Sequence, residues 1–477
     1  MIIFLSQQVL CRCNNKDGFM HFKPPYPTPH KTKSSFFLRF FRGWRSWLDV
    51  LFEKSYSMKM GEFSQPGMKV YMVNDPEWVT KILVKNQKAY PKHQMMHRML
   101  EPLLGNSIFT TNGEVWERQR ALVDQAFAQA RLRLVYPLMV ESVQEMLQRL
   151  DKVADGRSYE VDSEMTYVAA DIIFKTILSK SLDAQFAKTI YEDFIEFQHH
   201  AQKAMMLMIY RLPPYFSTKA SRKPAKRIRD ILSTIIAKRF AERADGTDSR
   251  YEDILSGLME AKDPVTGTRF TYDEMVDQVC MLFLAGHETS ASALAWSLYL
   301  LSQCPHLQTK IVDELNEKVG DKDIAYADVK QLDWVSDTFR ESMRLYPPVG
   351  FFVRESTQDE CIRDKNVKAG SPILVSPWLI HRHRDMWDDP DSFTPERFRT
   401  ESGKVSLKCA YIPFSKGSRV CIGAAFATQE AILTLASIVR RYEILPVPSH
   451  VPKVVGRVTI RSDNGIRVML KLRSITN

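Results

Sequence analysis

Cysteine is scarce and scattered in this sequence. Its 477 residues include seven cysteines, at positions 11, 13, 280, 304, 361, 409 and 421. An odd number without Cys-x-x-Cys spacing argues against a disulfide framework or a zinc site and favours a reducing compartment. We therefore expect a cytoplasmic protein in which most of these cysteines are structural.

Long hydrophobic runs are missing as well. The apolar start Met1–Leu5 is followed by Gln7 and Gln8 and lacks a basic leader, so it is typical of neither a membrane span nor a signal peptide. Because Met20 begins a stretch that is more typical of a protein N-terminus, our hypothesis is that residues 1–19 derive from an upstream translation start.

One later stretch, residues 272–303, is apolar nearly all round and suits either a buried core helix or a membrane span. Polar side chains within it, including Asp277, His287 and Glu288, would be costly in lipid. The pattern therefore favours a central helix of a globular core.

Internal repeats, long linkers and a strong compositional bias are absent. With 44% hydrophobic and 26% charged residues the chain is typical of a globular protein. Helical periodicity dominates, and strand-like runs lie near 69–73, 371–375 and 457–472. The predicted helices cover residues 114–128, 131–152, 163–179, 185–210, 224–243, 272–303, 306–318 and 334–345. We predict a mainly α fold with a minor β region, in which a main domain over 61–477 follows a basic, aromatic arm over 1–60.

The net charge is +10, and the excess is concentrated at two places. Residues 21–60 interleave eight Lys or Arg with aromatic side chains, against only two acids, and residues 219–229 form a second basic cluster. We favour the interpretation that the aromatics of the arm pack on the body while its cations are solvated. Peripheral contact with a membrane is the alternative. Neither cluster belongs to a known motif that recognises DNA or RNA, so we do not expect nucleic acid as a partner.

The most specific signal is the run Phe414-Ser415-Lys416-Gly417-Ser418-Arg419-Val420-Cys421-Ile422-Gly423, followed by a helical pattern from Ala424. A thiolate that binds iron needs a loop that approaches the porphyrin closely, with N–H donors around the sulfur. Gly417 and Gly423 permit such a backbone path, and the helix after them directs the positive end of its dipole at Cys421. The spacing Phe-x-x-Gly-x-Arg-x-Cys-x-Gly resembles the haem-binding loop of the cytochrome P-450 family.

This resemblance implies the cytochrome P-450 fold, a triangular prism in which haem b lies between a central oxygen-activating helix and the cysteine loop. It also implies that Cys421 is the axial ligand of the haem iron. Arg419 would then reach a haem propionate, and Phe414 would cover the thiolate.

Two further motifs imply contacts with the propionates. Trp116 and Arg120 resemble the Trp-x-x-x-Arg helix of the family, and their i,i+4 spacing puts both on one helix face. Arg354 falls where the family places another propionate arginine, and a planar, permanently charged guanidinium suits a carboxylate.

A third set of motifs implies a structural ion network. Glu341 and Arg344 resemble the Glu-x-x-Arg helix, and Arg397 lies in a run that resembles the loop whose arginine joins this pair. The network is expected to support the haem loop rather than to act in catalysis.

On the predicted central helix, Ala285-Gly286-His287-Glu288-Thr289-Ser290 resembles the oxygen-activation motif of the family. Splitting dioxygen at a haem requires two protons at the distal oxygen and a groove in which the oxygen lies. Gly286 has no side chain, so the helix is narrower beside Ala285. The Thr289 hydroxyl can donate a hydrogen bond to a backbone carbonyl or hold a water molecule. Glu288 is the acid placed to pass protons inward, so Thr289 and Glu288 are our candidate catalytic residues.

The motifs extend over about residues 60–475 and imply a monooxygenase that inserts one oxygen atom of O2 into a small organic substrate. No flavin or ferredoxin module accompanies them, so electrons from NAD(P)H require a separate donor, which we expect to be a ferredoxin with its ferredoxin reductase. We expect a monomer. Cations that suit an acidic donor, or simply a solvated surface, are Arg118, Lys404, Lys408 and Lys416.

Substrate contacts are expected around residues 90–108, 195–216, 349–352, Ala285 and Val458. Apolar side chains there, which favour hydroxylation of a lipid-like molecule, are Met205, Met206, Met208, Val349, Phe351 and Phe352. Hydrogen-bonding side chains are His93, Gln94, His97, Gln198, His199, His200 and Gln202. If they face the substrate, they favour oxidative O-demethylation of a polar methyl ether, such as a methylated sugar. The alternative is that these histidines face solvent and do not contact substrate. A peroxide-driven peroxygenase and a non-catalytic haem sensor or electron carrier are further alternatives, which have less need of the Glu288 and Thr289 pair.

Overall fold

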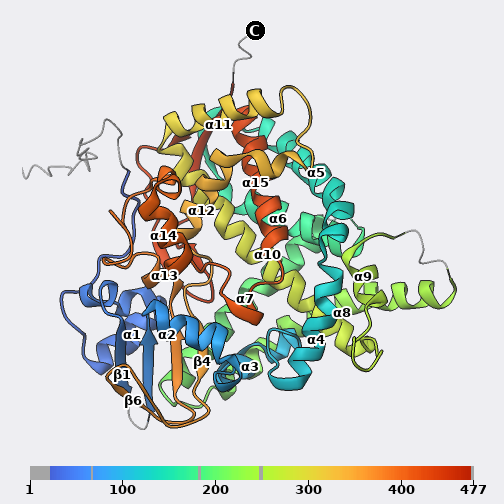
Figure 1. Cartoon of the computed structure of the whole chain (residues 1–477). Coiled ribbons are helices and arrows are strands. Elements are labelled where there is room, and N and C mark those ends of the chain that lie inside the picture. Colours follow the sequence, from blue (N-terminus) through green and yellow to red (C-terminus); the bar gives the residue numbers. More distant parts are fainter. Residues whose placement is uncertain (1–21, 66–67, 181–183, 247–250, 474–477) are drawn as a thin grey trace, which may run out of the picture.

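The computed structural model describes residues 22–65, 68–180, 184–246 and 251–473. Helices form most of the body, and a small sheet that contains β1 lies at the lower left of Figure 1. This arrangement confirms the predicted mainly α fold with a minor β region.

The periodic stretches of the sequence form long helices. These are α4 (Gly113–Ala126), α5 (Gln129–Asp151), α6 (Val161–Leu178), α7 (Ala184–Ile209), α8 (Tyr215–Ala244), α10 (Tyr272–Ser302), α11 (Pro305–Lys318) and α12 (Asp333–Leu345). Their bounds agree with the predicted ones except at the start of α8. That prediction was wrong because Pro224, which suits a first helical turn, lies inside the helix instead.

Shorter helices and one long helix complete the body. They are α1 (Phe36–Arg45), α2 (Pro76–Thr80), α3 (Gln94–Leu104), α9 (Ile254–Glu260), α13 (Pro377–Ile380), α14 (Glu401–Ala410) and α15 (Ala424–Arg441). The last of these confirms the helix predicted after the cysteine loop.

The largest sheet has the order β1-β2-β7-β4. Its strands are β1 (Met60–Gln65), β2 (Met68–Val73), β7 (Pro372–Val375) and β4 (Phe352–Glu355), and only the β2 and β7 pair is parallel. A second sheet, β3-β11-β8, joins Asp155–Glu160, Arg467–Leu472 and Tyr442–Pro446. Two small hairpins pair β5 (Glu360–Ile362) with β6 (Lys365–Val367) and β9 (Val454–Gly456) with β10 (Ile460–Ser462). The strand predicted over 457–472 is therefore two strands, because the chain turns at Asp463 and Asn464.

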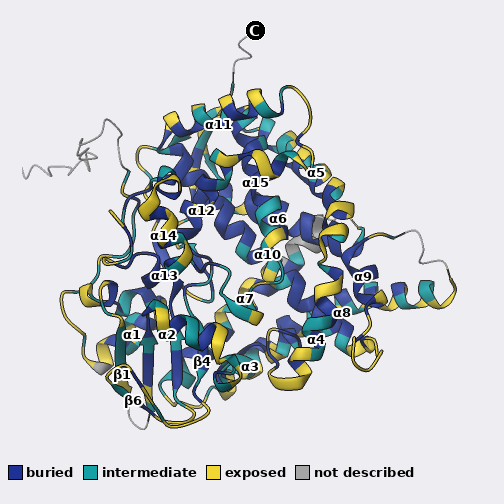
Figure 2. Ribbon diagram, in the orientation of Figure 1, coloured by how far each residue is buried: buried dark blue, intermediate teal, exposed yellow. Residues whose placement is uncertain are grey.

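Helix α10 runs through the centre of the molecule (Figure 1). The Thr271 side chain accepts a hydrogen bond from the Glu274 backbone, and Glu274 bonds back to Thr271, which fixes the start of the helix. It packs against α6 and α15, and Figure 2 shows this central region largely in the colour of buried residues. Its prediction as a buried core helix is confirmed. Within the described residues, none of the helices combines the length and apolar character that crossing a membrane requires.

The described part of the N-terminal arm packs against the body at several points. Leu48 is buried in the main core, Trp47 packs edge-on against Phe351, and the Tyr346 hydroxyl donates to the Pro25 carbonyl at 2.6 Å. The division of the chain at residue 60 stays a prediction, and residues 1–19 lie outside the described residues.

The aromatic side chains of the arm do not all pack inward. Phe37 and Phe41 on α1 are 74% and 70% exposed, whereas Leu48 is 3% exposed. The favoured interpretation is therefore confirmed for Trp47 and wrong for Phe37 and Phe41, because sequence alone does not show which face of α1 meets the body.

Candidate active site

The loop that carries Cys421 is shaped by one glycine. Gly417 has φ +77, and a Cβ there would lie 2.0 Å from the carbonyl oxygen of Leu83, so only glycine fits. The Cys421 amide donates to the Phe414 carbonyl at 2.9 Å and closes the loop. Gly423 has an ordinary φ of −84, and a Cβ there would lie 3.9 Å from Cys421 Sγ. The unusual backbone predicted for both glycines is therefore found only at Gly417.

The Cys421 thiol is exposed although protein surrounds its loop. The protein packed around the accessible thiol still removes much of its water and raises its pKa, while the Gly423 N–H and the charge of Arg120 act to lower it. The chain enters α15 at Ala424, so the positive end of the helix dipole lies directly after the sulfur. An accessible thiol with a backbone donor, a nearby cation and a helix N-terminus has the surroundings that a metal-binding thiolate needs.

Helix α10 has one short exposed face in its buried central stretch. Between Gln278 and Ser302, only residues 284–286 and 289 are not buried. Ala285 is exposed, and Gly286 packs so closely on α6 that a Cβ would lie 2.4 Å from Ile173 Cδ1. The Thr289 hydroxyl donates to the Ala285 carbonyl at 2.5 Å. The residues of the predicted oxygen-activation motif thus share one accessible face, with a hydroxyl bonded to its own helix.

Glu288 lies on another side of α10. Its carboxylate accepts hydrogen bonds from Arg461 at 2.9 Å and from Thr459 at 2.8 Å. Burial acts to raise the pKa of Glu288, but the charge and hydrogen bonds of Arg461 hold it below its ordinary value. The structure therefore pairs Glu288 with Arg461, and its role in proton delivery to Thr289 stays a prediction.

A cluster of cations lies beside the cysteine loop. Arg419 lies over the Trp116 ring at 4.1 Å and donates to Asn112, and Arg120 donates to the Val420 carbonyl at 2.7 Å. Burial lowers the pKa of Arg354 to about 10. Burial and the charges of Arg354 and Arg120 likewise lower the pKa of Arg419 to about 10. The structure brings together all of the predicted propionate residues.

Lys92 belongs to the same cluster, and sequence reasoning missed it. Its ammonium group donates to the carbonyls of Ile108 and Phe109, and its backbone pairs with that of Arg354. Burial, followed by the charges of Arg419, Arg354 and Arg120, lowers the pKa of Lys92 well below its ordinary value. A lone lysine after Tyr90 and Pro91 carries no spacing signal that could have revealed this position.

The cation cluster, Lys92, Arg120, Arg354 and Arg419, has more positive charge than its neighbouring carboxylates, Asp124 and Glu117, balance. Asp124 pairs with Arg120, whereas the hydrogen bonds of Arg419, Lys92 and Arg354 go to carbonyl and amide oxygens. Two propionates would neutralise such a cluster. The donor set, one accessible thiol and several converging cations, fits a haem.

Glu341, Arg344 and Arg397 form the predicted ion network. Arg344 donates to both Glu341 oxygens at 2.8 Å, and Arg397 donates to Oε1 at 2.8 Å. Burial opposes the charge on Glu341, but the two guanidinium groups keep its pKa below the ordinary value. His381, which the sequence did not single out, joins the Arg344 carbonyl to the Ile412 amide. Hydrogen bonds through His381 thus link the network to Ile412, two residues before Phe414 begins the cysteine loop.

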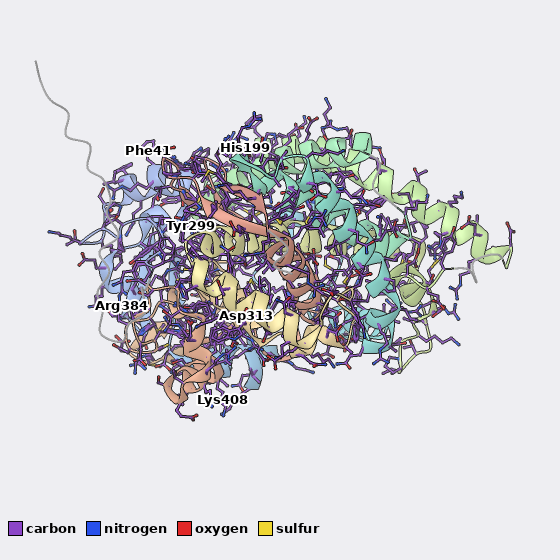
Figure 3. The ribbon with its side chains drawn as sticks, turned by 90° about the horizontal axis from the view of Figure 1, so that it is seen from above. Phe41, His199, Tyr299, Asp313, Arg384 and Lys408 are labelled. Atoms are coloured by element: carbon purple, nitrogen blue, oxygen red, sulfur yellow. The ribbon has the colours of Figure 1, made fainter. Side chains whose placement is uncertain are left out.

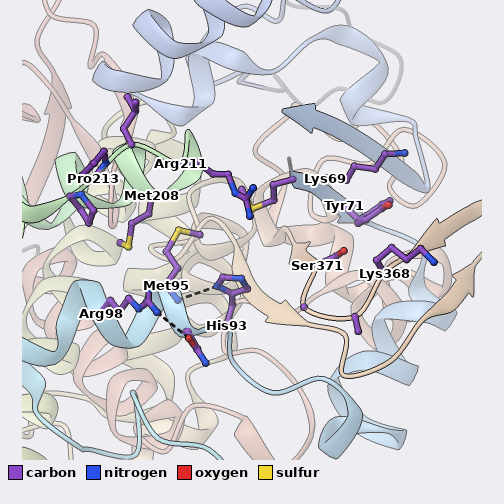
Figure 4. Close-up of a pocket in the computed structure, with 16 residues that line it drawn as sticks. Lys69, Tyr71, His93, Met95, Arg98, Met208, Arg211, Pro213, Lys368 and Ser371 are labelled. Atoms are coloured by element: carbon purple, nitrogen blue, oxygen red, sulfur yellow. Dashed lines mark hydrogen bonds between the residues drawn. The ribbon is translucent and has the colours of Figure 1, made fainter. Parts of the chain in front are cut away.

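The residues expected to contact substrate are spread over several places. His93, Gln94 and Met208 line a common cleft (Figure 4). Met205 and Met206 are instead buried, and His199 lies at the outer edge of the molecule in Figure 3. The two expected segments around 90–108 and 195–216 therefore meet, but through only some of the named side chains.

Comparison with known proteins supports a single family. A family model described as Cytochrome P450 matches residues 28–464. Cyclooctatin synthase from Streptomyces melanosporofaciens is 31% identical to this chain, over 80% of this chain and 81% of that protein. The protein LUTEIN DEFICIENT 5, chloroplastic, from Arabidopsis thaliana is 28% identical over 84% of this chain and 70% of that protein. Cytochrome P450 4Z1 from Homo sapiens is 28% identical over 85% of this chain and 83% of that protein.

A solved structure shares the fold. The crystal structure of cytochrome P450DA heme domain superposes with a TM-score of 0.77 at 23% sequence identity, covering 87% of this chain and 90% of that chain. The family match covers most of the sequence, and the thiol and cations at the site fit the cofactor of that family. This chain belongs to the cytochrome P450 family and is a monooxygenase that uses haem b, O2 and electrons derived from NAD(P)H.

Proposed function

We propose that this enzyme hydroxylates a lipid-like substrate, and that Cys421 is the residue whose thiolate would hold the haem iron. The observation that carries the substrate class is the cleft between α3 and residues 208–214, whose walls include the apolar side chains Met95, Met208 and Leu212. Apolar, flexible side chains of this kind suit a hydrocarbon substrate. The haem, when bound, supplies the activation of dioxygen and the transfer of one oxygen atom.

The residues of the chain hold the haem and control protons. Cys421 binds iron as a thiolate, and the Gly423 N–H and Arg120 favour that charged form. The cation cluster binds the propionates. With haem bound, the Thr289 hydroxyl would position a proton donor at the accessible face of α10, and Glu288 would supply protons to it.

The ligand assignment is tested by the ferrous carbon monoxide difference spectrum. The wild-type protein is expected to show the red-shifted Soret band of a thiolate haem, and Cys421→Ala is expected to lose it. Cys409→Ala is the matched control, because Cys409 is half-buried on α14 and is expected to leave the band unchanged. Persistence of the band in Cys421→Ala would overturn the assignment.

The substrate class is tested by screening long-chain alcohols, polycyclic lipids and methylated sugars for a low-to-high-spin shift of the haem and for oxidised product. O-demethylation of a methylated sugar is the second candidate, since His93 and Gln94 also line the cleft. Formaldehyde release from the sugar, without oxidation of the lipids, would favour that candidate.

We propose a ferredoxin with its reductase as the electron donor, docked near Lys408. Lys416 donates to the Lys408 carbonyl, so Lys408 lies beside the cysteine loop. Of the other predicted cations, Arg118 is bonded to Glu274 and Lys404 to Glu401. Lys408→Glu is expected to slow reduction by ferredoxin at low salt, whereas Lys322→Glu is expected to have no effect.

We also propose peripheral membrane contact through α1. This helix exposes Phe37 and Phe41 beside Arg42. The ring centroids of Phe40 and Tyr210 are 4.7 Å apart, so α1 lies next to the segment that follows α7. Exposed rings among cations suit an anionic lipid surface. Phe41 lies at one edge of the molecule and Lys408 at the opposite edge in Figure 3, so a membrane and a ferredoxin would not compete.

Vesicle co-sedimentation tests this contact. The wild-type protein is expected to bind phosphatidylserine-containing vesicles better than phosphatidylcholine vesicles, and the double change Phe37→Ser and Phe41→Ser is expected to abolish the difference. Val405→Ser is the control, because Val405 is a 64% exposed apolar residue on α14. Equal binding by the double variant would contradict the proposal.

A further inference from the structure

His381 is a buried residue between the ion network and the cysteine loop. It follows α13 directly, and its side chain is fully buried. Arg344 Nη1 donates to the His381 carbonyl at 2.8 Å, and His381 Nδ1 lies 3.2 Å from the Arg344 carbonyl oxygen. The Tyr411 ring stacks on the imidazole, with ring centroids 5.4 Å apart. These contacts fix the orientation of the imidazole.

The hydrogen bonds of the imidazole define its protonation state. The Ile412 amide donates to Nε2 at 2.8 Å, so Nε2 carries no proton. Nδ1 therefore carries the proton and donates to the Arg344 carbonyl. Burial, and after it the charges of Arg344 and Arg382, lower the pKa of His381 well below its ordinary value. The imidazole thus stays neutral and keeps one acceptor for Ile412 and one donor for Arg344.

Ile412 begins a tight turn that contains a strained residue. The Ser415 amide donates to the Ile412 carbonyl at 3.1 Å, and Ser415 has a φ of +66. The left-handed region is costly for serine, so this conformation persists only where the surroundings impose it. The Ser415 hydroxyl oxygen is buried and has no hydrogen-bond partner within the described part of the chain, so it does not fix the turn. The hydrogen bond from Ile412 to His381 is therefore a restraint on which the turn depends.

The same turn fixes the backbone of the cysteine. Phe414 lies within the turn, and its carbonyl accepts the Cys421 amide at 2.9 Å. Because a peptide unit is a rigid plane, a change of φ at Ser415 turns the Phe414 carbonyl away from the Cys421 amide. A continuous series of backbone contacts therefore joins the His381 imidazole to the cysteine.

We propose that His381 is a positioning residue for Cys421, because its Nε2 acceptor restrains the turn that holds the Cys421 amide. The inference rests on the proposed role of the Cys421 thiolate at the haem iron. Without the acceptor, Ser415 relaxes to an ordinary φ and the Cys421 amide loses its partner. The sulfur then leaves the one position at which the Gly423 N–H and the charge of Arg120 favour the thiolate.

Two substitutions at His381 separate its hydrogen bonds from its packing. His381→Phe keeps a ring against Tyr411 but removes both the acceptor and the donor. His381→Gln offers an amide oxygen to Ile412 and an amide N–H to Arg344, but no ring. Positioning by hydrogen bonds predicts that His381→Gln resembles the wild-type protein more than His381→Phe does, and the opposite order would contradict it.

Two further variants complete the set. His383→Phe is the matched control, because His383 is also fully buried but accepts its hydrogen bond from Asp385, outside the loop. In the double variant His381→Phe with Ser415→Gly, glycine adopts the positive φ without cost, so the turn no longer needs the restraint. We expect this double variant to recover most of what His381→Phe loses, which a general loss of stability does not predict.

Hydrogen exchange of the holoenzyme reads the turn without reference to turnover. The backbone amides of Ser415 and Cys421 are expected to exchange about tenfold faster in His381→Phe than in the wild-type protein. Their rates in His381→Gln, in the double variant and in His383→Phe are expected to stay close to the wild-type rates. Wild-type exchange at both amides in His381→Phe would overturn the inference.

The ferrous carbon monoxide spectrum reads the sulfur. His381→Phe is expected to lose most of the red-shifted thiolate band, whereas His381→Gln and the double variant keep most of it. Should His381→Phe fail to fold, loss of the band in folded His381→Gln would exclude His381 from the role. A full band in His381→Phe, with the band lost in Cys421→Ala, would sink the inference and leave the ligand assignment standing. Persistence of the band in Cys421→Ala would overturn the ligand assignment, while the exchange rates would still test the turn.

Discussion

Arg461 holds Glu288 in a buried salt bridge, with Nη2 at 2.8 Å from Oε2 and Nε at 2.9 Å from Oε1. The same guanidinium lies 3.9 Å from Asp162 Oδ1, and burial raises the pKa of Asp162 to about 6. Glu288 is therefore kept charged by a residue from β10. Its ability to move protons depends on that partner.

Replacing Arg461 with Gln leaves Glu288 buried without its counter-charge. Burial then raises the pKa of Glu288. We expect the variant to lose about 3–5 kcal/mol of unfolding free energy near neutral pH. Urea denaturation of the two proteins measures this loss. Arg457→Gln is the control, since its pair with Asp463 is partly exposed and is expected to contribute less than about 1 kcal/mol.

The pH dependence of the same variant has a defined sign. In the wild-type protein the lowered pKa of Glu288 contributes stability above the unfolded value of about 4.3, and this stability is lost as pH falls through the folded value. The variant takes up a proton at higher pH, which removes its buried charge. The difference in unfolding free energy should therefore narrow as pH falls, and a difference that widens in acid would contradict the pairing.

Thr289→Ala is expected to keep haem binding but to uncouple electron use from product formation. The hydroxyl is the accessible donor on the exposed face of α10, and its loss leaves no side chain there to position a proton donor. The ratio of product to NAD(P)H consumed measures coupling, with peroxide as the expected by-product. Ser297→Ala is the matched control, because Ser297 donates to the Ala293 carbonyl at 2.7 Å in the same manner but is buried. Unchanged coupling in Thr289→Ala would remove this residue from its proposed role.

Local patterns explain what the sequence could predict. The long apolar stretch with a few polar residues located α10, because a helix that is apolar nearly all round is a buried one. The Cys421 loop was recognisable because its whole motif, Phe-x-x-Gly-x-Arg-x-Cys-x-Gly, lies within residues 414–423. Glu341 and Arg344 were recognisable because the two residues pair with each other within one helix turn. Each of these features is encoded by residues that are close along the chain.

Long-range partners explain what the sequence could not predict. Glu288 and Arg461 are 173 positions apart, and no spacing rule connects them. Lys92 reaches the cation cluster because its backbone pairs with that of Arg354, a consequence of the fold alone. The exposure of Phe41 likewise depends on how α1 meets the body. Contacts of this kind follow from tertiary packing and not from local pattern.

Glu430→Gln is expected to flatten the pH dependence of stability. The Glu430 side chain on α15 is fully buried and accepts a hydrogen bond from Ser290 on α10 at 2.7 Å. Burial raises its pKa to about 8. The folded protein thus keeps the proton while the unfolded chain ionises above about pH 4.3, so stability falls as pH rises between these values.

The variant retains the shape and the hydrogen bond but has no proton to lose. Between about pH 5 and about pH 8 the wild-type protein should lose on the order of 4 kcal/mol more than Glu430→Gln. Urea unfolding across this range measures the difference. The exposed change Glu317→Gln should leave the wild-type slope intact. Parallel curves for Glu430→Gln and the wild-type protein would show that Glu430 is ionised in the folded state.

Lys92→Met is expected to weaken haem binding while sparing the apoprotein. Burial lowers the pKa of Lys92, and the neighbouring charges of Arg419, Arg354 and Arg120 lower it further because each cation repels the others. Removing one cation relieves this repulsion in the apoprotein, so its unfolding free energy should stay equal or rise. In the holoprotein the same change removes a partner of the propionates, and the rate of haem transfer to apomyoglobin should rise about tenfold. Lys88→Met is the control, since Lys88 is an exposed lysine nearby that pairs with Glu117. Unchanged haem transfer in Lys92→Met, or an apoprotein that it destabilises, would exclude Lys92 from the haem site.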